Sequence, residues 1–248
     1  YLMDTLSYDE DKNRLFDDRA SSTRVDPRET AEQFDSRAVD NNYVATYFPD
    51  VFITDDVNNR IVHAPASIAA ISALGVNDRL AYPWFAPAGF SRGALDFVHN
   101  VDTRLSQLDR DNLYDARINP IATFPNEGFV IFGQKTLQYA KSALDRVNVR
   151  RLLLEVKRQV VDVARSLVFE QNTPETRARF IGEVQPLLSI VQAQAGIEQF
   201  RIVMDNSNNS QEDVENNRLN GTIVLVPTRT IEFIAIDFII TNSGVEFV

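Results

Sequence analysis

The clearest pattern along the chain is a pair of segments in which apolar residues recur every three or four positions. In residues 147–167, valine and leucine fall on one face with charged residues largely between them, which predicts an amphipathic helix of about five turns. A second helix should begin at Pro174, because Thr173 suits a cap and proline suits the first helical turn. We expect Pro186 to kink or divide this helix and Gly196 to end it.

The first half of the chain carries weaker helix signals. Asp26 can cap a helix that starts at Pro27, where the fixed backbone angle of proline is favourable. Residues 65–74 begin with proline, are rich in alanine and are followed by Gly75, at which we expect this helix to stop. Short helical turns are expected around residues 105–113, where leucine recurs.

Strands are predicted where β-branched and aromatic residues cluster. These segments are residues 43–48, 51–54, 129–132, 200–204, 222–226 and 230–241. Between them we expect a break at Asn119–Pro120 and two loops. Residues 81–93 should form an ordered loop that buries Trp84, and residues 205–220 a polar loop. The last strand segment is apolar on both of its alternating faces, which is typical of a strand in the middle of a covered sheet.

Composition and charge suggest one main domain. With 248 residues and 44% apolar content, the chain is long enough to bury one substantial core. The first 40 residues hold eleven acidic and six basic residues, a balance of −5 within a net charge of −10 for the chain. We expect residues 1–40 to be an acidic, partly irregular and mostly solvated segment with a short helix, or a remnant of a preceding domain, and residues 41–248 to be the main domain. Because Tyr1 is not an initiator methionine and no signal peptide follows it, we expect the chain to begin inside a longer protein.

The same numbers argue against several classes of function. A net charge of −10 and a pI near 4.7 disfavour binding to nucleic acid. The absence of cysteine excludes disulfides, thiolate metal sites and a thiol nucleophile. The most apolar run, residues 233–240, is interrupted by Asp237 and is far shorter than the roughly 18 to 20 residues that span a bilayer. We therefore expect no insertion into a membrane.

Candidate chemistry is weak. Residues 89–93 match the G-x-S-x-G pattern of a hydrolase with Ser91 as nucleophile, but no strand pattern precedes them and His99 is too near in sequence. His99 and His63 lack the partners of a metal motif. Residues 205–209 lack the glycine and glutamate that a calcium loop needs further on. We expect no catalytic, metal or cofactor site, and no enzyme.

Several segments, taken in order, resemble the contractile tail sheath proteins of large phages. They are residues 42–49, 64–67, 86–89 with 92–93, 119–121, 124–133, 147–153, 168–172, 205–209 and 231–234. The match runs from about residue 40 to the C-terminus. The N-terminal arm and protruding outer domains that such sheaths usually carry are not visible, so the chain resembles the C-terminal or core part of a larger subunit.

The resemblance implies an α/β fold with a mixed β-sheet flanked by helices, and a structural function in the virion. Sheath subunits form six-membered rings that stack helically around an inner tail tube protein, between a baseplate and a tail terminator, and are assembled in the host cytoplasm. Contraction drives the tube through the bacterial envelope for genome delivery. The alternatives are the sheath of a type VI secretion system or a pyocin and, from another class, an α/β hydrolase that uses Ser91.

The resemblance also implies which residues meet other subunits. Exchange of strands between neighbouring copies would use the C-terminal residues Ile231, Phe233, Ile234, Ile236, Phe238, Ile240, Val245, Phe247 and Val248. Basic residues of the long helix are candidates to face the tube, namely Arg150, Arg151, Lys157 and Arg158. We expect the isolated chain to be a monomer or to associate weakly.

Overall fold

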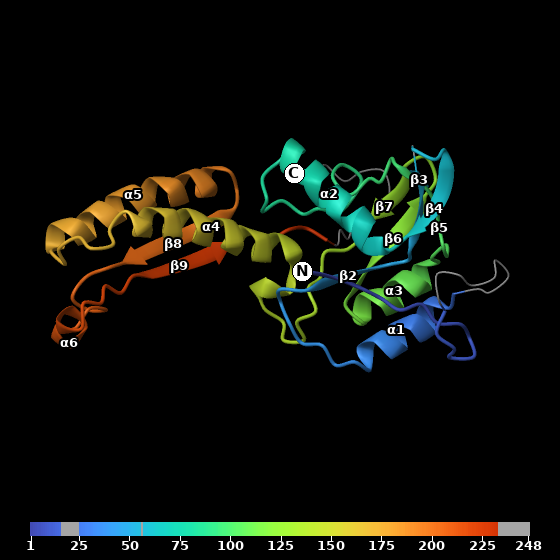
Figure 1. Ribbon diagram of the computed structural model, residues 1–248, viewed down its shortest axis with the longest axis horizontal. Coiled ribbons are helices and arrows are strands. Elements are labelled where there is room, and N and C mark those ends of the chain that lie inside the picture. Colours follow the sequence, from blue (N-terminus) through green and yellow to red (C-terminus); the bar gives the residue numbers. More distant parts are fainter. Residues whose placement is uncertain (16–24, 56, 233–248) are drawn as a thin grey trace, which may run out of the picture.

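The computed structural model describes residues 1–15, 25–55 and 57–232. Figure 1 shows two lobes: a sheet-containing lobe that holds most of the first half of the chain, and an elongated lobe of helices backed by a two-stranded sheet. The expected α/β fold, with mixed sheets flanked by helices, is confirmed.

A four-stranded mixed sheet forms the centre of the larger lobe. Its strands are β1 (Leu2–Asp4), β2 (Ala45–Phe48), β6 (Ile118–Phe124) and β7 (Gly128–Ile131), in the order β1-β2-β6-β7. The first three are parallel to one another, and β7 is antiparallel to β6. Strand β1 lies before the boundary that we expect at residue 40 and pairs with β2 beyond it. That boundary stays a prediction.

A second, antiparallel sheet has the order β4-β3-β5. Strands β3 (Val51–Asp55), β4 (Arg60–Ala64) and β5 (Val98–Val101) form it. The two strands expected within residues 43–54 therefore both exist but belong to different sheets. The helix α2 (Ala66–Leu80) packs on β1 and β2 through its small buried side chains, Ala66, Ala69, Ala70 and Ala73.

The helix α2 does not stop at Gly75, contrary to prediction. The residue is exposed, and a glycine at an exposed helical position costs only about 1 kcal/mol relative to alanine. Packing of the alanines outweighs this cost. The helix ends at Leu80, and Asn77 in its last turn has a buried side chain that donates to the backbone carbonyl of Tyr82 over 3.2 Å.

Asn119 and Pro120 also differ from the prediction, because they lie inside β6 rather than at a break. The buried amide of Asn119 explains how the strand tolerates the proline. Its nitrogen donates to the carbonyl oxygens of Thr46 and Lys135, both over 2.9 Å, and its oxygen accepts the Lys135 amide over 2.6 Å. These bonds tie β6 to the segments on both sides, where proline cannot donate.

Helices α1 (Pro27–Asp35) and α3 (Gln107–Asp115) cover the remaining part of this lobe. The carboxylate of Asp26 accepts the amides of the first helical turn, so the predicted cap of α1 is confirmed. Both helices bury side chains in a core cluster that also includes Phe48 from β2.

The elongated lobe begins with a short 3-10 turn at Ala143–Asp145, followed by the long helix α4 (Val147–Arg165). The helix α5 (Pro174–Ala193) packs against it. Antiparallel strands β8 (Ile197–Val203) and β9 (Thr222–Pro227) form the supporting sheet, and α6 (Gln211–Glu215) lies in the polar loop between them. The predicted positions of α4 and of both strands agree with the structure.

Pro186 does not divide α5, which runs unbroken from Pro174 to Ala193. Val184 and Leu188, on either side of the proline, are both buried in the same core. This shared packing holds the two halves of the helix on one surface. The predicted cap is confirmed, because the Thr173 hydroxyl accepts the amide of Thr176.

Trp84 is buried, as predicted, and connects the ordered loop to the elongated lobe. It stacks on Tyr82 with ring centroids 4.9 Å apart, and its indole nitrogen donates to the carbonyl oxygen of Gln194 over 3.1 Å. Its neighbours in the core include Leu152 of α4 and Ile197 of β8. The loop between the lobes is therefore part of their common packing.

Two glycine substitutions should change stability in opposite directions. A Cβ atom added at Gly75 meets nothing within 4 Å, so Gly75→Ala should raise the free energy of unfolding by about 1 kcal/mol. At Gly93 the same atom would lie 2.8 Å from both the Ala88 Cα and the Ile131 carbonyl oxygen, so Gly93→Ala should lower it by roughly 1 to 3 kcal/mol. Denaturant unfolding measures both; equal effects would contradict the packing described.

Candidate interaction surfaces

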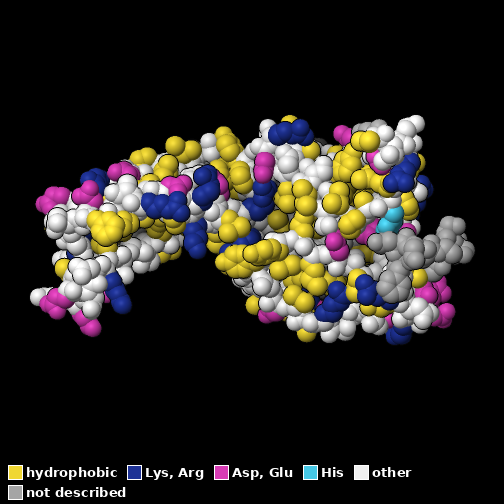
Figure 2. Space-filling view, in the orientation of Figure 1, with side chains coloured by type: hydrophobic (Ala, Val, Ile, Leu, Met, Phe, Trp, Pro, Cys, Tyr) yellow, Lys and Arg dark blue, Asp and Glu magenta, His cyan; other side chains and the backbone are white. Residues whose placement is uncertain are grey.

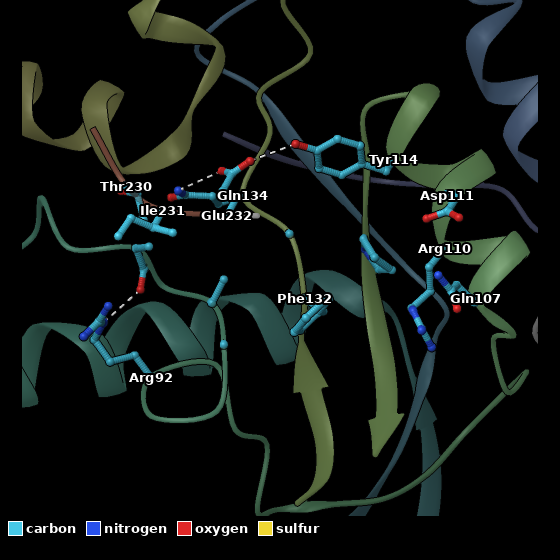
Figure 3. Close-up of a pocket in the computed structure, with 15 residues that line it drawn as sticks. Arg92, Gln107, Arg110, Asp111, Tyr114, Phe132, Gln134, Thr230, Ile231 and Glu232 are labelled. Carbon is cyan, nitrogen blue, oxygen red and sulfur yellow. Dashed lines mark hydrogen bonds between the residues drawn. The ribbon is translucent and has the colours of Figure 1, made fainter. Parts of the chain in front are cut away.

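Glu232, the last residue that the structure describes, is held by side chains from three separate segments. Its carboxylate accepts from the Gln134 Nε2 over 3.2 Å and from the Tyr114 hydroxyl over 2.8 Å (Figure 3). It also accepts from the Arg146 Nε over 2.7 Å. Arg146 also donates to the Tyr114 hydroxyl over 3.1 Å. Because the Arg146 and Glu232 side chains are only 26% and 20% exposed, the pair is largely shielded from water.

Burial and neighbouring charge shift the pKa values of this network. Burial, followed by the hydrogen bond to Glu232, raises the pKa of the Tyr114 phenol, so it stays a donor. Burial and the nearby Arg146 guanidinium lower the pKa of Lys135 to about 8. The Lys135 ammonium lies 3.4 Å from the centroid of the Tyr114 ring and donates to the Tyr114 carbonyl oxygen over 2.7 Å. The carboxylate of Glu232 therefore offsets these two cations together with Asp145, which pairs with Arg146 over 3.0 Å, and Asp115, which acts on Lys135.

A second contact fixes the chain two residues earlier. The side-chain amide of Asn148, which is 4% exposed, donates to the Thr230 hydroxyl over 3.0 Å and to the Trp84 carbonyl oxygen over 3.2 Å. Between the two held residues, Ile231 is 78% exposed. Thr230 and Glu232 are thus both attached to the start of α4, through Asn148 in its first turn and Arg146 at its N-cap.

A cavity of about 400 Å³ lies beside this network. Its wall combines small residues, aromatic rings and charged side chains, and Figure 3 shows Arg92, Arg110 and Phe132 around it with Thr230, Ile231 and Glu232 along one side. Phe132 belongs to a cluster with Phe90 and Phe124, whose ring centroids are 5.0 to 6.0 Å apart. Glu232, the last described residue, therefore lies in the wall of this cavity.

Of the residues expected to exchange strands, the structure describes only Ile231, which is exposed. The other eight, Phe233, Ile234, Ile236, Phe238, Ile240, Val245, Phe247 and Val248, lie outside the described residues. Their role stays a prediction.

Two of the four basic residues expected to face the tube are held within the chain. Arg150 donates to the Asn42 side chain over 2.5 Å and stacks on the ring of Tyr43, 4.0 Å from its centroid. Arg151 donates to both carboxylate oxygens of Asp78 over 2.6 Å. These contacts attach α4 to the larger lobe.

The other two lie further along the helix and are exposed. Arg158 pairs with Glu155 over 2.6 Å and with Asp162 over 3.8 Å on the surface of α4. Within the described residues, Lys157 has no ion pair that would hold it to the chain. Lys157 and Arg158 are therefore the exposed pair of the four, and a contact with the tube stays a prediction.

An apolar stripe runs along the outer side of the same helix and its following turn. Leu154, Val161 and Val168 are spaced by seven residues and are 48%, 37% and 60% exposed, and Phe169 after them is fully exposed. Leu154 and Val161 lie on nearly one line of α4, because seven residues are close to two helical turns, whereas Val168 and Phe169 follow the end of the helix at Arg165. Figure 2 shows apolar and basic side chains side by side over this lobe. Such a mixed surface is typical of a docking face.

The structure gives the hydrolase hypothesis no support. Ser91 lies in a turn with no helix directly after it and no strand directly before it, unlike a nucleophile elbow. His99 contacts Thr54 across the second sheet, and His63 lies 3.7 Å from Asp50. Across residues 1–15, 25–55 and 57–232, no group of three or more His, Asp or Glu side chains is placed to hold a metal ion. Nor does any helix in those ranges have the length and apolar content to cross a membrane.

The sequence patterns did not indicate the four residues of this network, which are Tyr114, Gln134, Arg146 and Glu232. They come from four places in the chain and match no motif. The only available signal was Glu232 itself, a charged residue at the start of the most apolar segment.

Comparison with known proteins gives a consistent result. The chain is 34% identical over 227 residues to the tail sheath protein of Vibrio phage KVP40, which covers 91% of the chain and 34% of the relative. It is 33% identical over 210 residues to the tail sheath protein of Enterobacteria phage T4, which covers 85% of the chain and 31% of that relative. The chain thus spans about a third of the length of these relatives. No family model matches it.

Solved structures share the fold. A sheath complex of an extracellular contractile injection system, PVC, in the contracted state has a TM-score of 0.75 at 22% identity over 84% of this chain and 59% of that one. The baseplate structure of the anti-feeding prophage has a TM-score of 0.73 at 22% identity over 82% of this chain and 56% of that one. The resemblance expected from the sequence is confirmed.

Substitution of Arg151 and of Lys157 by alanine should have different effects on the free energy of unfolding. Arg151→Ala breaks the bidentate contact with Asp78 and should lower the free energy of unfolding by about 1 kcal/mol, whereas Lys157→Ala should leave it unchanged. A double-mutant cycle of Arg151→Ala with Asp78→Ala isolates the pair. A coupling energy of zero would show that the contact does not attach α4 to the larger lobe.

Proposed function

Because this chain is similar to tail sheath proteins of contractile phages over most of its length, we propose that it is the core, C-terminal part of a contractile sheath subunit. The whole subunit polymerises around a tail tube and shortens to drive that tube through a bacterial envelope. The observation that supports this most is the similarity to the phage proteins, which at 91% of the chain includes both lobes. A structural protein of this kind needs no catalytic residue.

Self-assembly in this proposal uses the C-terminal segment. Residues 233–240 are apolar apart from Asp237 and follow in sequence Glu232, which lines the cavity and is held by Arg146. A strand given to the sheet of a neighbouring copy binds through main-chain hydrogen bonds, which keep copies connected while each one moves as a rigid body. Six-membered rings stacked in a helix are the arrangement that the resemblance implies.

Contact with the tube in this proposal uses the outer side of α4. Lys157 and Arg158 stand beside the apolar stripe of Leu154 and Val161, in a chain whose net charge is −10. A concentration of positive charge on one helix of an acidic protein favours an acidic partner surface. Exposed ion pairs contribute little each, which suits a contact that must be released during contraction.

The remaining partners and the location follow from the same proposal. A polymer of fixed length requires a baseplate at one end and a terminator at the other, and the assembled sheath belongs to the virion after assembly in the bacterial cytoplasm. The similarity of the fold to PVC and to the anti-feeding prophage keeps a tail-derived injection device as a second candidate. Neighbouring genes for a capsid and a terminase would support the phage.

Removal of the C-terminal segment tests the assembly. Deletion of residues 237–248 from the full-length polypeptide should abolish tubular polymers seen by electron microscopy, because the strand that links copies is lost. The fold of both lobes should persist, since residues 1–15, 25–55 and 57–232 contain their cores. Normal tubes from the truncated protein would refute strand exchange through this segment.

Charge reversal tests the tube contact. Lys157→Glu with Arg158→Glu should reduce binding of purified tube protein in sedimentation assays without preventing sheath polymers, because both side chains are exposed and outside the core. A matched control is Arg28→Glu with Arg60→Glu, two exposed residues of the larger lobe. Equal losses in the two double variants, or no loss in the first, would remove α4 as the tube-facing element.

A further inference from the structure

Without further contacts, a force on the C-terminal segment would act first on the strand before it, β9. Among the residues that the structure describes, β9 pairs only with β8, and a two-stranded sheet is weak on its own. After β9 ends at Pro227, only five residues separate it from the end of the described chain. A pull on the segment would act on the end of β9 and open its hydrogen bonds one pair at a time.

The contacts of Thr230 and Glu232 bear such a force before it reaches β9. Thr230 is bonded to Asn148, and Glu232 to Arg146, so both are attached to the first turn of α4. Neither contact involves β8 or β9. The chain between Pro227 and Thr230 is therefore shielded from tension that enters beyond Glu232.

The partners of these two residues are themselves well anchored. Asn148 is buried and also bonded to the backbone at Trp84, inside the core of the elongated lobe. Tyr114, which donates to Glu232, belongs to α3 in the larger lobe. Gln134, the third donor, is 3% exposed. Force that reaches Glu232 is thus divided between both lobes.

We propose that Thr230 and Glu232 form a clamp that passes tension on the C-terminal segment into α4 and α3 and keeps it from unzipping β9. Force on the C-terminal segment reaches these two side chains before it reaches β9. Both side chains lie on one side of the chain, and Ile231 points to solvent. Its use rests on the proposed function, because tension arises only if another copy holds the segment. The clamp itself exists in the single chain and is tested there.

Single-molecule pulling on the full chain tests the clamp. The chain has no cysteine, so the attachment points Ile71→Cys and Val248→Cys are unique. In the wild type, β9 should stay paired until the lobes open. Glu232→Gln combined with Thr230→Val should add an early event at lower force, in which residues 222–232 are freed. Their fully extended length is at most roughly 40 Å, and the chain lengthens by that length minus the distance that these residues already span.

Two controls separate a clamp from general stability. Ile231→Ser changes the exposed residue between the clamp residues and should behave as the wild type. Pulling between Ile71→Cys and Glu215→Cys loads the loop before β9, so the force bypasses the clamp, and the double variant should then match the wild type. The single variants Glu232→Gln and Thr230→Val should give intermediate forces if the double variant folds poorly.

The outcomes are distinct. An early event that appears only in the clamp variants, and only when the force enters through residue 248, supports the clamp. No early event in those variants, or equal weakening in both pulling directions, overturns it. Polymerisation of the full-length protein is a separate measurement, so failure of the sheath proposal would show there and would leave the pulling result intact.

Discussion

The first turn of α4 is the position on which the rest of the molecule depends, because contacts from three directions meet there. Asn148 binds the loop at Trp84 and the hydroxyl of Thr230, and Arg146 binds the carboxylate of Glu232 and the hydroxyl of Tyr114. A largely buried ion pair with several hydrogen bonds adds little net stability but strongly penalises the loss of either partner. It therefore fixes one geometry for the lobes and for the point at which the chain leaves them.

That constraint also fixes the near end of the elongated lobe. From its fixed first turn, α4 extends about 28 Å at 1.5 Å per residue and carries the exposed basic residues and the apolar stripe away from the larger lobe. Arg150 and Arg151 attach its near end, through Tyr43 and Asp78. The core beneath α4 is closely packed with side chains of α5 and β8.

Local signals in the sequence were sufficient for the elements that depend on local physics. The periodicity of residues 147–167 predicted α4, and the caps at Asp26 and Thr173 predicted the starts of α1 and α5. The predictions failed at Gly75 and Asn119–Pro120, and Pro186 does not divide α5; at these places distant packing or a buried amide compensates for a residue that disfavours the element. The network around Glu232 could not be predicted, because its donors lie 86 to 118 residues away and match no motif. The family resemblance supplied the function that the chemistry of single residues did not.

The most direct test of the central claim is a structure of polymers of the full-length protein by electron microscopy, at a resolution that traces each chain. The expected map shows Thr230 and Glu232 of every copy against Asn148 and Arg146 of the same copy, with the chain beyond Glu232 entering the sheet of a neighbour. A map in which residues 233–248 lie on their own subunit, or in which Glu232 has left Arg146, would contradict the account.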